Sequence, residues 1–477
     1  MTLCRVINLD RRCFLTGAGA TLATASGLRL GHAAPPAGDL VADVGQQVLT
    51  TGRGSTAVDT WCYGGSVPGP LLRYSRGERL DLVFQNRLPE PSAVHWHGLR
   101  PPNGMDGAAL LTQAPVEPGE SFRYAFDLDD AGTYWYHTHF RGWNQQDRGL
   151  YGVLIVDEDE PTKVDRDVLL VLDDWVLTRS GALAQSFGDL HEWAHAGRLG
   201  NLATINNHAD ASVPMRAGER IRLRLVNVAN AQIFALMFDG HDPVVIAEDG
   251  NPVTPWTLGR RELLLGPGQR ADLMVDAVGA PSSRHAIRAY TLRDEIRMGS
   301  FVYADEAGGS GLVGTGVLPL EANARPELKL PDARRLELSM EGGAMGRMGG
   351  AMMGGRMMGM RELMRNRRIW AFNGVAGDMD TPLATLRRGE TVVIEMINDT
   401  AFPHAMHLHG MHFREVARNG APVADGPWRD TSLMASDDKV SIAFVAETPG
   451  KWMLHCHMIE HQASGMMTFI EVEGDEA

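Results

Sequence analysis

Four motifs in this chain each place two histidines one residue apart. On a strand, residues i and i+2 lie on the same face about 6.5–7 Å apart, so one motif can offer imidazoles to two neighbouring metal ions. Imidazole is a common ligand of copper, zinc and iron. Eight imidazoles in this pattern predict a pocket that holds several metal ions, rather than eight unrelated core or surface histidines. The motifs are His95/His97, His137/His139, His407/His409 and His455/His457.

A cysteine, Cys456, stands inside the last of these motifs. Its side chain is expected on the opposite face of the strand from the two histidines that flank it. Two His, one Cys and a weak axial Met form the ligand set of a blue-copper electron-transfer site. The alternatives are an inert buried thiol and a disulfide with Cys62. The pattern favours a mononuclear copper site, one strand face away from the cluster, with His404, Cys456, His461 and Met466 as its ligands.

Three similar segments must position these motifs. Each is a glycine turn followed by a largely alternating strand that ends at Asn, at residues 77–86, 218–227 and 389–398. Their domain-sized spacing predicts three homologous β-domains. A second repeat joins only the outer two, at residues 131–139 and 449–457. The middle domain has no copper motif and is expected to be a spacer.

The composition and the N-terminal residues limit the classes to which this protein can belong. The chain has 44% hydrophobic and 22% charged residues, and its net charge of −14 argues against a nucleic-acid or anionic-membrane partner. Arg11 and Arg12 precede a mildly apolar stretch and a small-residue cleavage context, which predicts a twin-arginine signal peptide over residues 1–33. The alternative, a transmembrane helix, needs a longer apolar run. We expect a periplasmic protein without membrane insertion, and a monomer.

The histidine motifs resemble the four copper motifs of the multicopper oxidases. They are His-Trp-His-Gly at 95–98, His-Thr-His at 137–139, His-Ala-Met-His-Leu-His-Gly at 404–410 and His-Cys-His-Met-Ile-Glu-His at 455–461. The resemblance implies an all-β fold of three cupredoxin-like Greek-key β-sandwich domains, at 38–157, 165–306 and 327–474. It also implies four copper ions. Type 1 copper takes His404, Cys456, His461 and Met466; type 2 takes His95 and His407; and the type 3 pair takes His97, His137, His139, His409, His455 and His457.

The reaction that this family implies is one-electron oxidation of a reductant, with four electrons passed on to reduce dioxygen to water. Cys456 and His404 are then the residues that carry electrons in. Forming water also needs protons, and Asp106 lies in a loop nine residues after His97. A turn aspartate that satisfies its own backbone is the alternative for Asp106. A second family acid is replaced here by Gln462, which cannot shuttle protons as a carboxylate does.

A methionine-rich segment at residues 340–364 bears on the reductant. Thioethers are soft ligands that suit Cu(I), and the segment resembles the insert of periplasmic cuprous oxidases of the CueO type. Met340 matches a substrate-copper ligand of that group. The alternative is a flexible lid without a copper role. We therefore expect a copper-tolerance oxidase of Cu(I); a laccase-like oxidase of phenols or other organic reductants is the main alternative, and a non-enzymatic copper-sequestering protein is a weaker one.

One further motif matches a metal-binding pattern but is not expected to form a zinc site. His191 and His195, with Glu192 between them, fit the helical zinc-hydrolase pattern. The match has no supporting third ligand, so a surface helix of the middle domain is the favoured interpretation.

Overall fold

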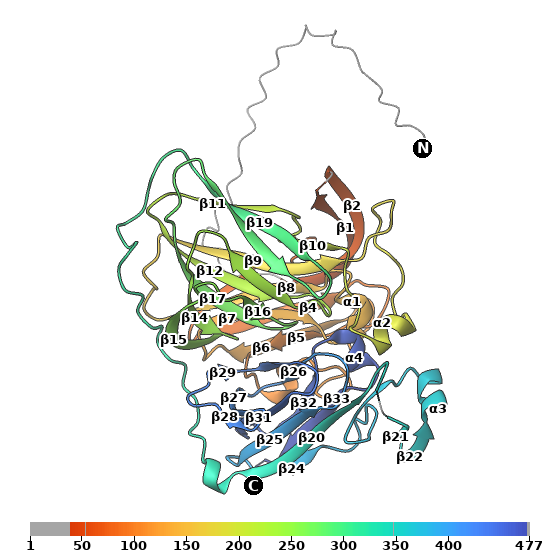
Figure 1. The fold of residues 1–477 in the computed structure, drawn as a ribbon. Coiled ribbons are helices and arrows are strands. Elements are labelled where there is room, and N and C mark those ends of the chain that lie inside the picture. The colour runs from red at the N-terminus through yellow and green to blue at the C-terminus, as the bar shows by residue number, and fades with distance from the viewer. Residues whose placement is uncertain (1–38, 53, 347, 475–477) are drawn as a thin grey trace, which may run out of the picture. The chain divides into compact units, whose positions relative to one another are not determined.

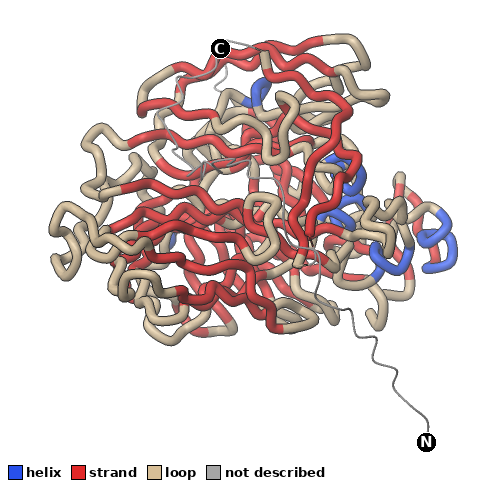
Figure 2. Tube along the Cα trace, turned by 90° about the horizontal axis from the view of Figure 1, so that it is seen from above, coloured by secondary structure: helices blue, strands red, loops and turns tan. Residues whose placement is uncertain are grey.

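The computed structural model describes residues 39–52, 54–346 and 348–474. The expected signal peptide, residues 1–33, lies outside the described residues. Within them strands are the main regular structure, joined by loops, and the helices are few and short (Figure 2). None of these helices is long and apolar enough to cross a membrane. The prediction of an all-β fold of cupredoxin-like sandwiches is confirmed, and the strands form an N-terminal, a middle and a C-terminal sandwich (Figure 1).

The N-terminal sandwich has two four-stranded sheets, in the orders β2-β1-β4-β6 and β3-β8-β7-β5. A core of aliphatic and aromatic side chains that includes Trp96, Tyr124 and Tyr134 lies between them. The strands are β1 (Leu40–Thr51), β2 (Gly54–Tyr63), β3 (Leu72–Ser75), β4 (Arg79–Asn86), β5 (Val94–His97), β6 (Ser121–Asp127), β7 (Gly132–Thr138) and β8 (Tyr151–Asp157); η1 (Asn103–Met105) and α1 (Gly142–Gln145) lie in the loops.

The middle sandwich has sheets in the orders β10-β9-β12-β17-β14-β15 and β11-β19-β18-β13-β16. Its elements are β9 (Arg166–Trp175), α2 (Leu190–Ala194), β10 (Leu202–Ile205), β11 (Ala211–Met215), β12 (Arg220–Asn227), β13 (Phe234–Phe238), β14 (Val244–Glu248), β15 (Asn251–Thr257), β16 (Leu263–Leu265), β17 (Arg270–Asp276), β18 (Arg284–Tyr290) and β19 (Glu295–Tyr303).

The C-terminal sandwich has sheets in the orders β23-β20-β25-β31-β27-β28, with β29 paired to β27, and β24-β33-β32-β26-β30. Its elements are η2 (Leu330–Asp332), β20 (Arg334–Gly342), β23 (Trp370–Phe372), β24 (Ala384–Leu386), β25 (Thr391–Asn398), β26 (His404–Leu408), β27 (Phe413–Arg418), β28 (Ala421–Pro422), β29 (Trp428–Arg429), β30 (Thr431–Met434), β31 (Lys439–Val445), β32 (Gly450–Cys456), α4 (Ile459–Ala463) and β33 (Met467–Val472). The methionine-rich segment adds the hairpin β21 (Gly350–Met353) and β22 (Arg356–Gly359), and the helix α3 (Met360–Arg365).

The three repeated segments form equivalent strands, β4, β12 and β25. Each pairs in parallel with the first strand of its own sandwich, which is β1, β9 or β20. The recurring Asn has a structural reason. Asn86, Asn227 and Asn398 each donate through Nδ2 to two loop carbonyls and accept a backbone N–H two residues on, so the amide closes the turn after the strand.

Candidate metal centre

Strand pairing brings the histidine motifs together in two neighbouring pairs. In the N-terminal sandwich β5 lies antiparallel to β7, with His95 opposite His137. In the C-terminal sandwich β26 lies antiparallel to β32, with His407 opposite His455. Because side chains alternate along a strand, both histidines of each motif point to one face. Seven of the eight imidazoles are buried, and His139 is partly exposed.

The two pairs of motifs then come together where the N-terminal sandwich contacts the C-terminal sandwich. Nε2 of His95 lies 3.5 Å from Nε2 of His407, and Nε2 of His409 lies 3.0 Å from Nε2 of His455. The His97 and His407 rings stack, with centroids 3.7 Å apart. All eight predicted cluster histidines therefore lie in one group.

The buried nitrogens of this group fit metal ligation. Within the described part of the chain, Nδ1 of His97, Nε2 of His137 and both ring nitrogens of His457 are buried without a hydrogen-bond partner. Leaving such groups unpaired costs about 1–3 kcal/mol each. Burial, followed by neighbouring imidazoles, lowers the pKa of His137, His139, His409 and His457 well below the ordinary value. These four imidazoles are therefore neutral, which is the form that binds metals.

A second group stands on the opposite face of β32. Sγ of Cys456 lies 3.6 Å from Nδ1 of His404 and 3.8 Å from Nδ1 of His461, and these three atoms could hold one ion. Met466 is fully buried in the same core as Cys456. Burial raises the pKa of the Cys456 thiol to about 12, so only a bound cation would make it a thiolate at neutral pH. Cys62 and Cys456 are both free, and no disulfide joins them.

The outer nitrogens of these two imidazoles are already engaged. Nε2 of His404 lies 2.8 Å from Oγ1 of Thr400, and Nε2 of His461 donates to the backbone carbonyl of His195 at 2.6 Å. The latter bond fixes the tautomer of His461 so that Nδ1 faces Cys456. His404, the residue expected to receive electrons, is fully buried.

Asp106 lies where the sequence interpretation requires, against the cluster. Its Oδ2 accepts from Nδ1 of His409 at 2.9 Å, its backbone carbonyl accepts from Nδ1 of His95 at 2.8 Å, and its other carboxylate oxygen is buried without a partner. Gly107 makes this approach possible, because a Cβ there would stand 1.8 Å from the carbonyl oxygen of Val94. Asp106 thus orients two imidazoles, His409 through its carboxylate and His95 through its backbone carbonyl, and its second carboxylate oxygen accepts no hydrogen bond.

Sequence reasoning missed two further residues at the cluster, Asp430 and Arg270. Asp430 is buried, with Oδ1 3.0 Å from Nε2 of His97, and it accepts two hydrogen bonds from Arg270, at 2.8 and 2.7 Å. Burial raises the pKa of Asp430, but Arg270 and then His97 outweigh it and hold the pKa well below the usual range. Arg270 belongs to β17 of the middle sandwich. The middle sandwich therefore contributes a side chain next to the cluster and is more than the spacer that the sequence predicts. Neither residue lies in a recognisable motif.

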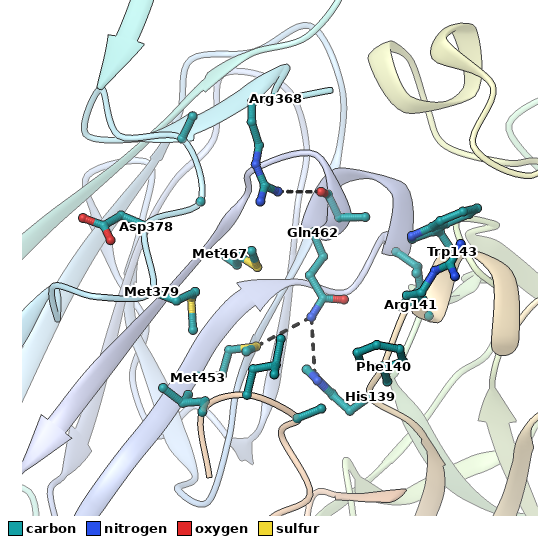
Figure 3. Close-up of a pocket in the computed structure, with 18 of the residues that line it drawn as sticks. His139, Phe140, Arg141, Trp143, Arg368, Asp378, Met379, Met453, Gln462 and Met467 are labelled. Carbon is teal, nitrogen blue, oxygen red and sulfur yellow. Dashed lines mark hydrogen bonds between the residues drawn. The ribbon is translucent and has the colours of Figure 1, made fainter. Parts of the chain in front are cut away.

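Gln462 forms part of a cavity of about 720 Å³ that reaches the cluster (Figure 3). Its Nε2 lies 3.5 Å from Nε2 of His139 and 3.6 Å from Sδ of Met453. Glu460, two residues earlier, turns the other way and accepts from Asn230 at 3.2 Å. The position beside His139 is therefore occupied by an amide, and Glu460 does not replace it as a carboxylate there.

The methionine-rich segment divides into buried and exposed members. Met340 is fully buried in the C-terminal core, since it lies on the inward face of β20 with Leu338. The role of Met340 as a substrate-copper ligand stays a prediction, for a side chain that packs into the core. In contrast, Met345, Met357 and Met364 are 78%, 65% and 44% exposed.

Comparisons with known proteins agree with this geometry. Models of the multicopper oxidase family match residues 46–161, 166–304 and 355–476. The chain is 30% identical to multicopper oxidase MmcO of Mycobacterium tuberculosis, over 88% of this chain and 84% of that protein. It is 24% identical to copper resistance protein A of Escherichia coli, over 86% of this chain and 88% of that protein. Laccase-2 of Botryotinia fuckeliana is 26% identical, over 87% of this chain and 79% of that protein.

Solved structures with a similar fold also include a multicopper oxidase. A multi-copper oxidase from Pseudomonas thermotolerans aligns with a TM-score of 0.78 and 33% identity, covering 91% of this chain and 98% of that chain. Lac15 from a marine microbial metagenome aligns with a TM-score of 0.72 and 35% identity, covering 91% of this chain and all of the other. The chain belongs to the multicopper oxidase family, whose members are copper-dependent oxidoreductases.

Proposed function

We propose that this oxidoreductase couples the one-electron oxidation of Cu(I) to the four-electron reduction of dioxygen to water, as a copper-tolerance enzyme. The observation that carries the proposal is the set of exposed thioethers at Met345, Met357 and Met364, because soft sulfur ligands select Cu(I). The similarity to copper resistance protein A supports it. A laccase-like oxidase of phenols is the second candidate, supported by the similarity to laccases.

The proposed cofactor is four copper ions, and the unpartnered buried imidazole nitrogens support this assignment. Bound copper would supply one-electron redox chemistry and a site for dioxygen. The proposed ligands are His404, Cys456, His461 and Met466 for type 1; His95 and His407 for type 2; and His97, His137, His139, His409, His455 and His457 for type 3.

The chain's own residues then have separate roles. Cys456 connects through the backbone to His455 and His457, which gives a short covalent route between the two groups. Asp106 holds His409 in orientation and keeps a buried carboxylate oxygen beside the cluster, where protons are needed. Gln462 can hydrogen-bond at the cavity side of His139 but cannot carry a proton as an acid.

The remaining parts of the proposal concern organisation and location. We propose domains at residues 38–157, 165–306 and 327–474, a periplasmic location reached by twin-arginine export, and a monomer. These rest on the sequence patterns described above.

The reductant is tested by replacing Met345, Met357 and Met364 with Leu. Leu keeps the volume and removes the thioether, so we expect KM for Cu(I) to rise by about tenfold, the factor that corresponds to about 1.4 kcal/mol of binding. Oxidation of a phenol should change by less than twofold. Met237→Leu, in the middle sandwich, is the matched control. If the triple variant keeps the wild-type KM for Cu(I), or if both substrates respond alike, the laccase-like alternative is favoured.

A further inference from the structure

The predicted electron-accepting imidazoles are closed off from any reductant. His404 and His461 are both fully buried, and Trp370 packs against them with ring centroids 5.3 Å and 4.3 Å away. Their outer nitrogens are engaged with Thr400 and with the carbonyl of His195. A reductant therefore cannot touch either ring, and its electron must enter through the residues that cover them.

Helix α2 of the middle sandwich provides that cover over His461. Three successive carbonyls at its C-terminal end accept hydrogen bonds from the C-terminal sandwich. The carbonyl of Trp193 accepts from Nε1 of Trp370 at 2.8 Å, that of Ala194 from the N–H of Ala344 at 2.6 Å, and that of His195 from Nε2 of His461 at 2.6 Å. These bonds satisfy carbonyls that a helix end leaves free, so α2 is fixed in register with the type 1 ligands.

Helix α2 and its C-cap residue carry the two imidazoles of the zinc-hydrolase-like motif. His191 is exposed and His195 is partly exposed. Their rings stack with centroids 4.0 Å apart, as expected for residues i and i+4 on one helix face. Nδ1 of His195 bonds the carbonyl of His191, which leaves its Nε2 outward. Among the described residues, neither that nitrogen nor the ring of His191 has another hydrogen-bond partner.

The motif lacks what a zinc hydrolase needs. Among the described residues, no third His, Cys, Asp or Glu joins His191 and His195 in a candidate metal group. Glu192, which would be the base of such an enzyme, instead pairs with Arg198 at 3.0 Å. Two imidazoles without a third protein ligand suit a transient cation site better than a permanent one.

We propose that His191 and His195 bind the Cu(I) substrate and are the point at which the electron of Cu(I), but not that of other reductants, enters the enzyme; this inference deepens the proposed function and rests on it. Cu(I) held there loses one electron and becomes Cu(II), and the type 1 centre, the oxidant in the proposed reaction, gains that electron. The route runs from the His195 side chain through its carbonyl and the hydrogen bond to Nε2 of His461. No proton has to move. Cu(II) then leaves the two-ligand site, and another Cu(I) takes its place.

The first experiment measures binding without turnover. Fully reduced holoenzyme is titrated anaerobically with Cu(I) against a chromogenic Cu(I) chelator, so that no electron can be transferred. The His191→Ala/His195→Ala variant, which keeps the His195 carbonyl, should bind one equivalent fewer than wild type. His208→Ala is the matched control, because His208 is an exposed histidine of the middle sandwich that bonds Thr50. Equal stoichiometry in the double variant and the control overturns the inference.

The second experiment follows electron entry. Anaerobic stopped-flow bleaching of the oxidised enzyme by Cu(I) should slow by about tenfold or more in the double variant, since losing a metal-binding imidazole costs at least as much as losing an outer partner of one. Bleaching by ascorbate should stay within twofold. Unchanged bleaching by Cu(I) overturns the entry role even if binding is lost. If wild type itself is not bleached by Cu(I), the proposed function fails instead.

Discussion

In the proposed function, Asp106 both positions an imidazole and supplies protons. One oxygen holds His409, and the other is buried and unpartnered beside His95. The amide at Gln462 leaves the cavity side of the cluster without an acid at that position. If the proposed function holds, the protons for water formation are therefore expected to pass mainly through Asp106.

Replacement of Asp106 by Asn tests this role. Asn can still accept from Nδ1 of His409, so the cluster geometry should persist and reduction of the blue centre should be nearly unchanged. Reoxidation by dioxygen should slow by about a hundredfold, the lower range for losing a general acid. Stopped-flow bleaching and recovery separate the two steps, with Asp59→Asn as an exposed control. Equal recovery rates would remove Asp106 from proton delivery.

At the level of strands, the alternating pattern explains what the sequence could predict. The paired histidines and the repeated Asn-terminated strands follow from local spacing, and they lie as expected. The predicted role of Met340 rests on resemblance alone, whereas its burial beside Leu338 follows from the alternation along β20. Arg270 and Asp430 are 160 residues apart and belong to no local pattern. The carbonyl of His195 is a backbone group, which no residue type reveals.

Strand β17 contributes Arg270, which donates two hydrogen bonds to the Asp430 carboxylate beside the cluster. Arg270→Met should leave the buried Asp430 carboxylate without its partner, costing about 3–5 kcal/mol of stability, and copper should be lost from the cluster before the blue centre. Copper content, the blue absorption and thermal unfolding together measure this. Arg288→Met should change stability little, because Arg288 and its partners Asp239 and Glu295 are accessible to solvent. Arg270→Lys keeps the charge without the paired hydrogen bonds, and full copper content in both Arg270 variants would contradict the role.

At the scale of the whole molecule, buried acids gather where the N-terminal and middle sandwiches meet. Tyr151 of β8 donates to Asp173 of β9, and the backbone N–H of Gly200 donates to Asp174. Burial raises the pKa of Asp174 to about 7. An acid whose pKa is raised by folding keeps its proton in the folded state, so its stabilising effect is complete below pH 3.8 and is lost as the pH rises through about 7.

We therefore expect thermal stability to fall between about pH 4 and pH 7, and Asp174→Asn to flatten that fall. The amide oxygen can still accept from Gly200, so the variant should be more stable than wild type at pH 8 by at most about 4 kcal/mol, the equivalent of some three pH units. The difference should vanish near pH 4. Unfolding temperatures measured across this range check it, with Asp59→Asn as control. A variant that is less stable at every pH would contradict the assignment.

Metal binding at the histidine cluster also affects the conformational entropy of the unfolded chain. His95 and His407, whose Nε2 atoms lie 3.5 Å apart, are separated by 312 residues. An ion shared between them closes a loop of that length, and such a closure restricts the unfolded chain as a disulfide does, by an entropy that grows with the logarithm of loop length. The bound metal would then act as a reversible cross-link in a chain without disulfides among its described residues. The resistance of the protein to heat would therefore depend on the copper supply around it.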